Sequence, residues 1–331
     1  MKSRRDAIFE GTRVAAELHE RLNTRSVLER SGGPVNVFGT IVNAKIPLVF
    51  KPLDGLLGAY LTKPAPGIIV TTKRPLSVQR FTGAHELGHA MMHHEPSLDD
   101  EAIITRAESP NAIYDSRETA ANTFATDFLL PRWLIITQMT RHRWTMNSLT
   151  DARIVYQLAL RAGTSFEATT IALLRHRLIT DSVFARLRQT TLKDIKQSLL
   201  EGQSLENWYP DIWLLTEADE GTFIQGDARD VFVVRLQEHS AAGYLWDIED
   251  LNRAGFVLLR DDRLFPETDE DIGGAVERVL AARAGENWVG HVQLVHTRPW
   301  EDAPVSRFSF TFDLRGKENG KPRAVRRPIA A

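Results

Sequence analysis

Hydrophobic positions in the first 131 residues follow two different periods. Over residues 5–30 they recur at helical spacing with charged residues between them. From residue 35 to 72 they gather into short runs of Val, Ile, Phe and Tyr that Gly and Pro separate, a pattern typical of strands. Helical spacing returns over residues 75–94 and 115–131, and the second of these helices stops before its closing Pro. This order predicts an α+β domain.

The rest of the chain changes character twice. The pattern is helical from residue 133 to about 200 and breaks at Ala162–Gly163–Thr164, which predicts a helix pair resembling helix-turn-helix. After residue 205, β-rich runs alternate with Gly and acidic turns, as in an all-β, immunoglobulin-like sandwich. The predicted parts are an α+β domain (1–131), a helical region (132–204), a sandwich (205–315) and a disordered basic tail (316–331).

Composition narrows the class of protein. A chain of 331 residues is longer than one hydrophobic core usually serves, so several domains are expected. There is no cysteine, which excludes disulfides, thiolate metal sites and a cysteine nucleophile. The sequence shows neither a signal-peptide pattern nor an apolar run long enough to span a bilayer. These features predict a cytoplasmic protein that is not inserted in a membrane.

Charge is distributed unevenly along the chain. Residues 132–196 carry eleven Lys and Arg against four Asp and Glu, whereas residues 201–315 carry ten Arg against twenty-three Asp and Glu. One hypothesis is that the acidic sandwich docks on the basic helices and covers a cleft of the chain. Another is that the basic helices track DNA phosphates. Direct nucleic-acid binding is not favoured, because these helices lack a recognition face rich in Arg, Asn and Gln.

The segment HELGH carries the strongest chemical signal. Positions i and i+4 lie on one face of a helix, so His85 and His89 can point at the same ion. Glu86 lies about 100° round the helix, from where it reaches a water molecule rather than the ion. Two imidazoles and a carboxylate base are what zinc-assisted hydrolysis requires, with Glu86 as the general base. The alternative is a chance match whose core-facing histidines are only hydrogen-bonded.

A catalytic zinc ion needs a third protein ligand, for which Glu118 is the best candidate. Glu118 and Asn122 share a stripe of otherwise small or apolar residues, and a carboxylate on a core-facing stripe needs a partner. The alternative is a capping box in which Glu118 bonds back to its own helix start at Asp115. Asn122 is expected either to orient one of the ligands or to make an ordinary interior hydrogen bond.

The residues that follow the motif complete the set of candidates. His93 and His94 fit a solvated helix end, and Glu95 stands where enzymes of the H-E-x-x-H-x-x-G-x-x-H type have their third histidine. That subclass is therefore disfavoured. Tyr114 and His93 are the candidates for contact with the oxyanion or the substrate.

The segments RPLSVQRFTGAHELGHA and ETAANTFATDFLLP, with VFKPLDGLLGAYL and GIIVTT before them, resemble the ImmA/IrrE family of zinc metallo-endopeptidases. The resemblance covers roughly residues 10–180. It implies that His85, His89 and Glu118 bind Zn²⁺ and that Glu86 is the general base. It also implies a zincin-like fold, with a small mixed sheet on helices and a helix-turn-helix-like extension. Well-known members cleave a helix-turn-helix repressor, often encoded beside them, so such a protein is the expected partner.

Three stretches of the acidic region, EHSAAGYLWDI, DIGGAVERVLAARAG and HTRPWED, resemble the loops of chagasin-like inhibitors of papain-type cysteine proteases. The resemblance spans about residues 215–315 and implies a sandwich with three adjacent binding loops and a protease as partner. The matching residues are Gly243, Tyr244, Trp246, Gly273, Gly274, Arg298, Pro299 and Trp300. In place of the usual Asn-Pro-Thr-Thr before the glycine, this chain has His239–Ser240–Ala241–Ala242.

The leading hypothesis is thus a zinc endopeptidase of the HExxH, gluzincin-like type, whose sandwich recognises a target or regulates the peptidase. The alternative is a cysteine-protease inhibitor, or a DNA-binding regulator, built on a non-catalytic metallopeptidase-like scaffold.

Overall fold

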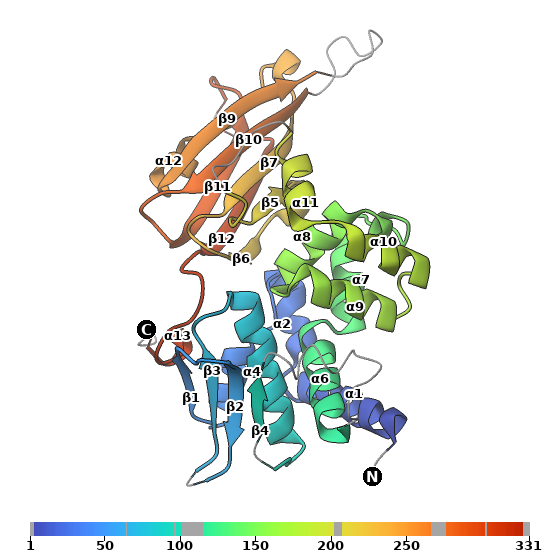
Figure 1. Cartoon of the computed structure of the whole chain (residues 1–331). Coiled ribbons are helices and arrows are strands. Elements are labelled where there is room, and N and C mark those ends of the chain that lie inside the picture. Colours follow the sequence, from blue (N-terminus) through green and yellow to red (C-terminus); the bar gives the residue numbers. More distant parts are fainter. Residues whose placement is uncertain are drawn as a thin grey trace.

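The computed structural model describes residues 3–63, 65–95, 97–100, 115–201, 207–265, 276–301 and 303–326. They form an α+β unit, a helical unit and a β-sandwich, in that order (Figure 1). The predicted fold class is therefore confirmed. Within the described ranges, no helix is both long enough and apolar enough to cross a membrane.

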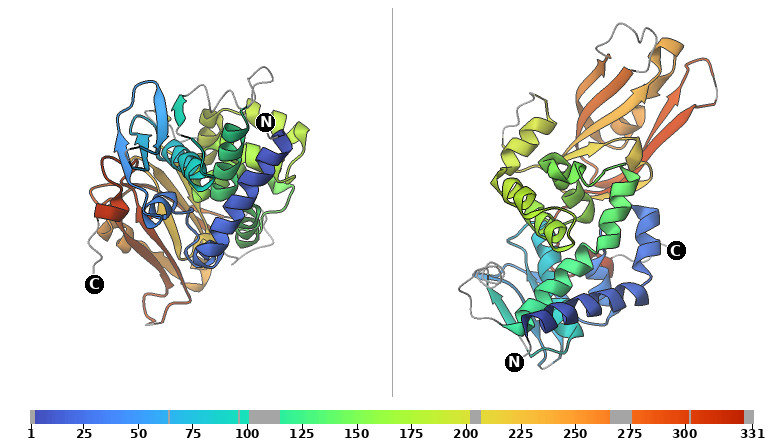
Figure 2. Two further views of the ribbon diagram at one scale, coloured as in Figure 1. Left: turned by 90° about the horizontal axis from the view of Figure 1, so that it is seen from below. Right: turned by 90° about the vertical axis from the view of Figure 1, so that its right-hand side faces the viewer.

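The first unit packs long helices on a mixed sheet. Its elements are α1 (Arg4–Arg21), α2 (Thr24–Ser31), α3 (Val37–Asn43), β1 (Leu48–Lys51), β2 (Leu56–Leu61), β3 (Gly67–Thr71), α4 (Leu76–Met91), β4 (Ser97–Asp100) and α6 (Ser116–Leu129). The strand order is β1-β3-β2-β4, with β1 parallel to β3 and β2 antiparallel to both neighbours. α4 packs on β2 and β3, and α6 lies between α4 and α1 (Figure 2). The unit thus places α4 and α6 side by side.

The second unit consists of short helices with well-defined starts. They are α7 (Arg132–Arg141), α8 (Ala152–Ala162), α9 (Phe166–Arg175), α10 (Asp181–Gln189) and α11 (Leu192–Leu199). Each of α8 to α11 begins after an Asp, Ser or Thr whose side chain accepts a backbone N–H, which satisfies a donor that the helix itself leaves open. The predicted break between α8 and α9 falls at Gly163, as the sequence indicates.

The third unit is a sandwich of two four-stranded sheets, ordered β5-β7-β10-β9 and β6-β12-β11-β8. Its elements are β5 (Ile212–Leu215), β6 (Thr222–Gln225), β7 (Val231–Glu238), β8 (Leu245–Asp247), α12 (Glu249–Arg253), β9 (Phe256–Leu264), β10 (Val276–Ala284), β11 (Val289–Thr297) and β12 (Ser306–Asp313). Stacked and edge-to-face phenylalanines, Phe232, Phe256 and Phe310, fill the space between the sheets. The outer face of β5, β7 and β10 is also buried, because α8 and α11 cover it.

The sandwich docks on the helical unit through paired polar groups. The Tyr156 hydroxyl on α8 donates to Asp211 at 2.8 Å, and Lys196 on α11 lies 3.0 Å from the same carboxylate. Arg161 forms a buried two-pronged pair with Asp219, with N–O distances of 2.9 Å. The acidic sandwich therefore does dock on the basic helices. Arg161 and Lys196, which contribute to the positive charge of this segment, are buried in this junction.

The expectation that the sandwich covers the catalytic cleft is wrong for the part of the chain that the structure describes. The sandwich reaches α4 at its first turns, where the buried Arg80 donates to the carbonyl of Gly163 and to the side chain of Gln225. His85 and His89 lie further along α4, which runs away from this junction (Figure 1). Nine residues from Arg80 to His89 correspond to about 13 Å along a helix.

The prediction of a disordered tail is wrong for residues 316–326. The backbone of Glu318 pairs with the side chain of Gln79 through two hydrogen bonds of 2.8 and 3.1 Å. Gly320 and Phe50 exchange two backbone hydrogen bonds of 2.7 and 3.0 Å, and α13 (Arg323–Arg326) follows. The charged, Gly-rich composition of this segment predicts disorder. Its ordering depends on hydrogen-bond partners that lie far away in the sequence. Residues 316–326 thus pack against the first unit (Figure 1).

His142 lies at the same junction as Arg161 and gives it a pH dependence. Its ring stacks on Trp144 at 4.5 Å, and its Nε2 is 3.5 Å from Asp219. Burial, with the nearby Arg161, lowers the pKa of His142 from 6.5 to about 4. The folded protein therefore binds fewer protons than the unfolded chain between these values, so this residue lowers the free energy of unfolding as pH falls through that window.

We expect His142→Phe to lessen this acid destabilisation by on the order of 2–3 kcal/mol. The free energy of unfolding is measured by urea titration of the wild type and the variant at pH 7 and at about pH 4.5. The variant should lose less stability between the two pH values than the wild type. Equal losses in both proteins would contradict the assignment.

Candidate functional site

The three predicted ligands converge between α4 and α6. His85 Nε2 and His89 Nε2 are 2.9 Å apart, and the Glu118 carboxylate lies 3.2 Å from the first and 3.5 Å from the second. Both imidazoles are almost fully buried, whereas Glu118 is 17% exposed. Burial alone would raise the pKa of Glu118, but hydrogen bonds from His85 and His89 hold it well below its ordinary value. The site is thus a buried pair of imidazole nitrogens with a partly exposed carboxylate beside it.

The alternative role of Glu118 in a capping box is not what the structure shows. The Asp115 side chain caps α6 by accepting from the backbone N–H of Arg117 at 2.8 Å. Glu118 points at the two histidines instead, so it is available as a ligand.

This set of donors fits a zinc ion. Tetrahedral zinc with bonds of about 2.0–2.1 Å places neighbouring ligand atoms about 3.3 Å apart. The observed separations of 2.9, 3.2 and 3.5 Å bracket that value. Two imidazole nitrogens and one carboxylate oxygen are also the donors of catalytic zinc sites, which keep the fourth position open. The arrangement therefore suits a catalytic rather than a structural metal.

Glu86 lies on the strand side of α4, where β2 approaches the helix closely. Glu86 is fully buried. The approach depends on Gly58 of β2, because a Cβ on this residue would lie 2.9 Å from Glu86 Oε1 and would overlap the Thr82 methyl group. Gly58 therefore makes room for the carboxylate of the predicted base. The sequence offered only a weak signal for it, a glycine inside a strand pattern.

We expect Gly58→Ala to displace Glu86 or β2, which costs about 1–3 kcal/mol of stability as overpacking does and lowers peptidase activity. Gly67→Ala on β3 is the matched control, because its nearest contact would be an ordinary 3.6 Å to the Pro47 carbonyl. Thermal unfolding and substrate cleavage are measured for both variants. A Gly58→Ala protein that is as stable and active as the control would show that the space beside Glu86 is not needed.

The remaining four candidates around the metal site have different outcomes. Tyr114 lies outside the described residues. His93 is exposed at the end of α4 and has no ring contact with the ligands in the described structure, so its substrate contact stays a prediction. Asn122 makes no hydrogen bond to the ligands either; its Oδ1 is buried without a partner among the described residues. His94, which the sequence assigned to solvent, instead lies 3.0 Å from His89, and burial lowers its pKa to about 4.

The chagasin-like residues form a second cluster, at one end of the sandwich. The strand pairings place the ends of β7 and β11 and the start of β8 there. Arg298 stacks over the Tyr244 ring at 4.2 Å, and both side chains bond to Glu301. Gly243, with φ of 78°, lies under the Trp300 indole, where a Cβ would come within 2.8 Å of the ring. Trp300 is 71% exposed, so the cluster presents one aromatic anchor to solvent.

The other predicted loop residues differ in burial and in their contacts. Trp246 is buried, donates from Nε1 to the Gln237 carbonyl at 2.9 Å and stacks on His296. It therefore supports the loops rather than contacting a partner. Pro299 is exposed, and Gly273 and Gly274 lie outside the described residues. Glu301 was missed, although its position three residues after Arg298 is a recognisable pairing distance.

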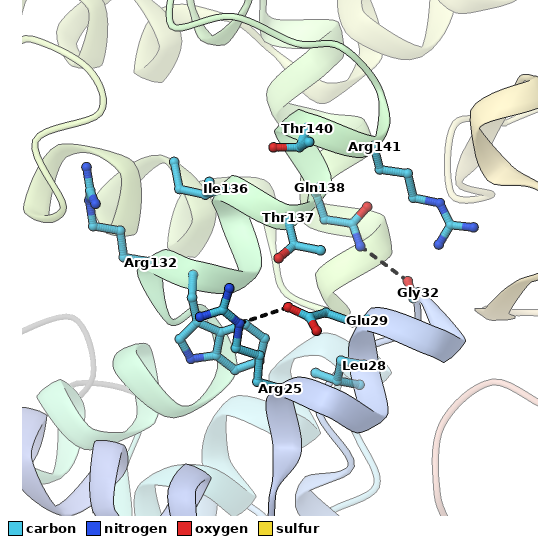
Figure 3. Close-up of a pocket in the computed structure, with 11 residues that line it drawn as sticks. Arg25, Leu28, Glu29, Gly32, Arg132, Ile136, Thr137, Gln138, Thr140 and Arg141 are labelled. Atoms are coloured by element: carbon cyan, nitrogen blue, oxygen red, sulfur yellow. Dashed lines mark hydrogen bonds and ion pairs between the residues drawn. The ribbon is translucent and has the colours of Figure 1, made fainter.

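A surface cavity of about 860 Å³ lies between α2 and α7 (Figure 3). Arg25 and Glu29 pair with each other along α2, and Gln138 donates to the Gly32 carbonyl. None of its lining residues lies on α4 or α6. The cavity is therefore separate from the metal site.

Two parts of the chain match the models of known families. The IrrE N-terminal-like domain of peptidases matches residues 43–174, and the chagasin family of peptidase inhibitors matches residues 227–313. No curated protein matches the chain.

Three solved structures are similar to parts of the chain. A cysteine protease inhibitor from Entamoeba histolytica is 21% identical, covers 32% of this chain and 98% of its own, and has a TM-score of 0.30. The solution structure of amebosin is 18% identical, covers 31% and 97%, and has a TM-score of 0.26. A Mycobacterium tuberculosis transcriptional regulator is 14% identical, covers 85% and 80%, and has a TM-score of 0.32.

The chain thus combines a segment similar to the IrrE N-terminal-like domain, residues 43–174, with a segment similar to the chagasin family of peptidase inhibitors, residues 227–313.

Proposed function

We propose that this chain is a zinc-dependent endopeptidase that cleaves a helix-turn-helix transcriptional repressor. The observation that carries the proposal is the convergence of His85, His89 and Glu118 within 4.8 Å of one another, with Glu86 buried on the next face of the same helix. The family match supports a peptidase, and the donor set supports zinc.

The chain's own residues divide the chemistry between them. His85, His89 and Glu118 would hold the zinc ion, which when bound supplies Lewis acidity for the water and for the peptide carbonyl. Glu86 takes the proton of the attacking water and returns it to the leaving amine. Its burial beside Gly58 keeps the carboxylate in a dry environment, where electrostatic interactions are stronger than in water.

The repressor as substrate rests on the resemblance to ImmA/IrrE peptidases. The test incubates the purified full chain, first stripped of metal and then reloaded with zinc, with the helix-turn-helix repressor encoded beside its gene. Mass spectrometry should find one internal cut that appears only with zinc. A zinc-loaded chain that leaves the repressor intact would rule out this substrate, and a chain that binds no zinc would rule out the metallopeptidase.

The sandwich has a second candidate function, inhibition of a papain-type cysteine protease. The observation in its favour is the exposed Trp300 beside the stacked Arg298 and Tyr244, at an end of the molecule that the peptidase domain leaves open. Inhibition of papain by the full chain is the test, with Trp300→Ala as the comparison. Inhibition by the wild type but not by the Trp300→Ala variant would support this role. No inhibition at micromolar concentrations would leave recognition or regulation of the peptidase as the function of the sandwich.

A DNA-binding role has less support. Arg161 and Lys196, two cations of the basic segment, are buried against carboxylates of the sandwich and are not available to phosphates.

A further inference from the structure

The two ring nitrogens of His89 have different surroundings. Nε2 faces His85 Nε2 at 2.9 Å, inside the group of zinc donors. Nδ1 lies 3.0 Å from Nδ1 of His94, whose ring crosses that of His89 at 68° with the centroids 5.1 Å apart. His94 therefore contacts the side of His89 that faces away from the metal position.

The end of α4 places His94 there. His93 adopts the left-handed conformation, with φ of 55°. The N–H of His93 bonds to the Ala90 carbonyl at 3.3 Å, and the N–H of His94 bonds to the His89 carbonyl at 3.0 Å. These two bonds form the Schellman arrangement that closes many helices. The chain thereby folds back, so that the second of two adjacent histidines returns to the last turn of α4 while the first remains exposed.

The chemistry of the contact assigns its hydrogen. Two ring nitrogens 3.0 Å apart share one hydrogen, so one donates and the other accepts. Nε2 of His89 must be free of a proton to bind a metal, which leaves the hydrogen of a neutral imidazole on Nδ1. His89 therefore donates to Nδ1 of His94. Metal-binding histidines commonly donate their second N–H to such an acceptor, which fixes the tautomer and the orientation of the ring.

We propose that His94 is a positioning residue for zinc: it accepts the Nδ1 hydrogen of His89 and holds that imidazole with Nε2 directed at the ion. The proposal rests on the zinc site of the proposed function. Removing an acceptor of this kind typically weakens metal binding by about 10–100-fold. Glu118 and His85 have no contact with His94 among the described hydrogen bonds and ring contacts, so the effect should pass through His89.

The test compares two substitutions of similar size in the full chain. His94→Asn keeps an acceptor oxygen close to the position of Nδ1, whereas His94→Leu has none. The zinc dissociation constant is measured by competition with a chromophoric chelator. His94→Leu should bind zinc about 10–100-fold more weakly than the wild type, and His94→Asn should stay within about 3-fold of it. His93→Asn is the control, since it removes the adjacent exposed imidazole and tolerates the left-handed conformation.

The stability of the metal-free proteins is measured in parallel, because a purely packing role would change it without separating the two variants in zinc affinity. The proposal is overturned if His94→Asn and His94→Leu bind zinc equally, whether both match the wild type or both are weak. A wild-type chain that binds no zinc would instead remove the proposed function itself, so the two failures are distinguishable.

Discussion

Replacing Glu86 with Gln is expected to lower kcat/KM for substrate cleavage by about 10²–10⁴-fold, the contribution of a general acid–base residue. The amide has the shape of the carboxylate but cannot take a proton from water. The zinc content should be unchanged, because Glu86 is not among the three converging donors.

Cleavage is followed under single-turnover conditions, and zinc is measured by elemental analysis of the same samples. Glu17→Gln is the matched control, because it makes the same chemical change at an exposed position on α1. If Glu86→Gln cleaves as fast as this control, Glu86 is not the base. If it loses its zinc, the loss of activity says nothing about proton transfer, and the assignment of Glu86 outside the ligand set is wrong.

The second large effect is expected at Glu118. Glu118→Ala should weaken zinc binding by about 10²–10³-fold, because a four-ligand zinc site contributes about 10–16 kcal/mol in total and this change removes one ligand. The two buried histidines, 2.9 Å apart, are then left without the carboxylate that lies 3.2 and 3.5 Å from their Nε2 atoms. Activity should fall in proportion to the zinc lost and recover in part at high zinc concentration.

Asp115→Asn is the control for this substitution. It removes a carboxylate three residues away on the same helix but preserves the cap, because Asn serves as well as Asp at the helix start. Its zinc affinity should match that of the wild type. Equal losses in the two variants would show that general negative charge at the start of α6, rather than coordination by Glu118, holds the metal.

Local patterns predicted most of the fold. Helical and strand periods are properties of neighbouring residues, so the α+β unit, the break at Gly163 and the sandwich could be predicted. The exception is Val37–Asn43, where the pattern predicted a strand and the structure has the helix α3. The order of the segment around Glu318 could not be predicted in this way. Its hydrogen-bond partners, Gln79 and Phe50, are more than two hundred residues away in the sequence. The composition of a segment indicates how polar it is. It does not show which distant residues accept or donate hydrogen bonds to its backbone.

The sequence also predicted most of the residues of the candidate metal site. HELGH fixes two donors one turn apart on any helix, and an acidic residue on an otherwise small and apolar stripe signals a buried partner. Gly58 and His94 escaped notice because neither has a local pattern that relates it to the motif. Their roles depend on how closely β2 approaches α4 and on how the chain turns after His93.

The sequence by itself determined the chemistry of this protein: His85, Glu86 and His89 at helical spacing, and an aromatic and cationic loop set around Tyr244 and Trp300 in a separate domain. Only the tertiary structure decided that Glu118 faces the histidines rather than its own helix start. It also decided that the sandwich docks at the first turns of α4, before the metal-ligand candidates on that helix. The physical reason is that residue type and spacing determine which chemical groups a helix or loop presents. Packing between elements that are distant in the sequence determines which groups those side chains contact.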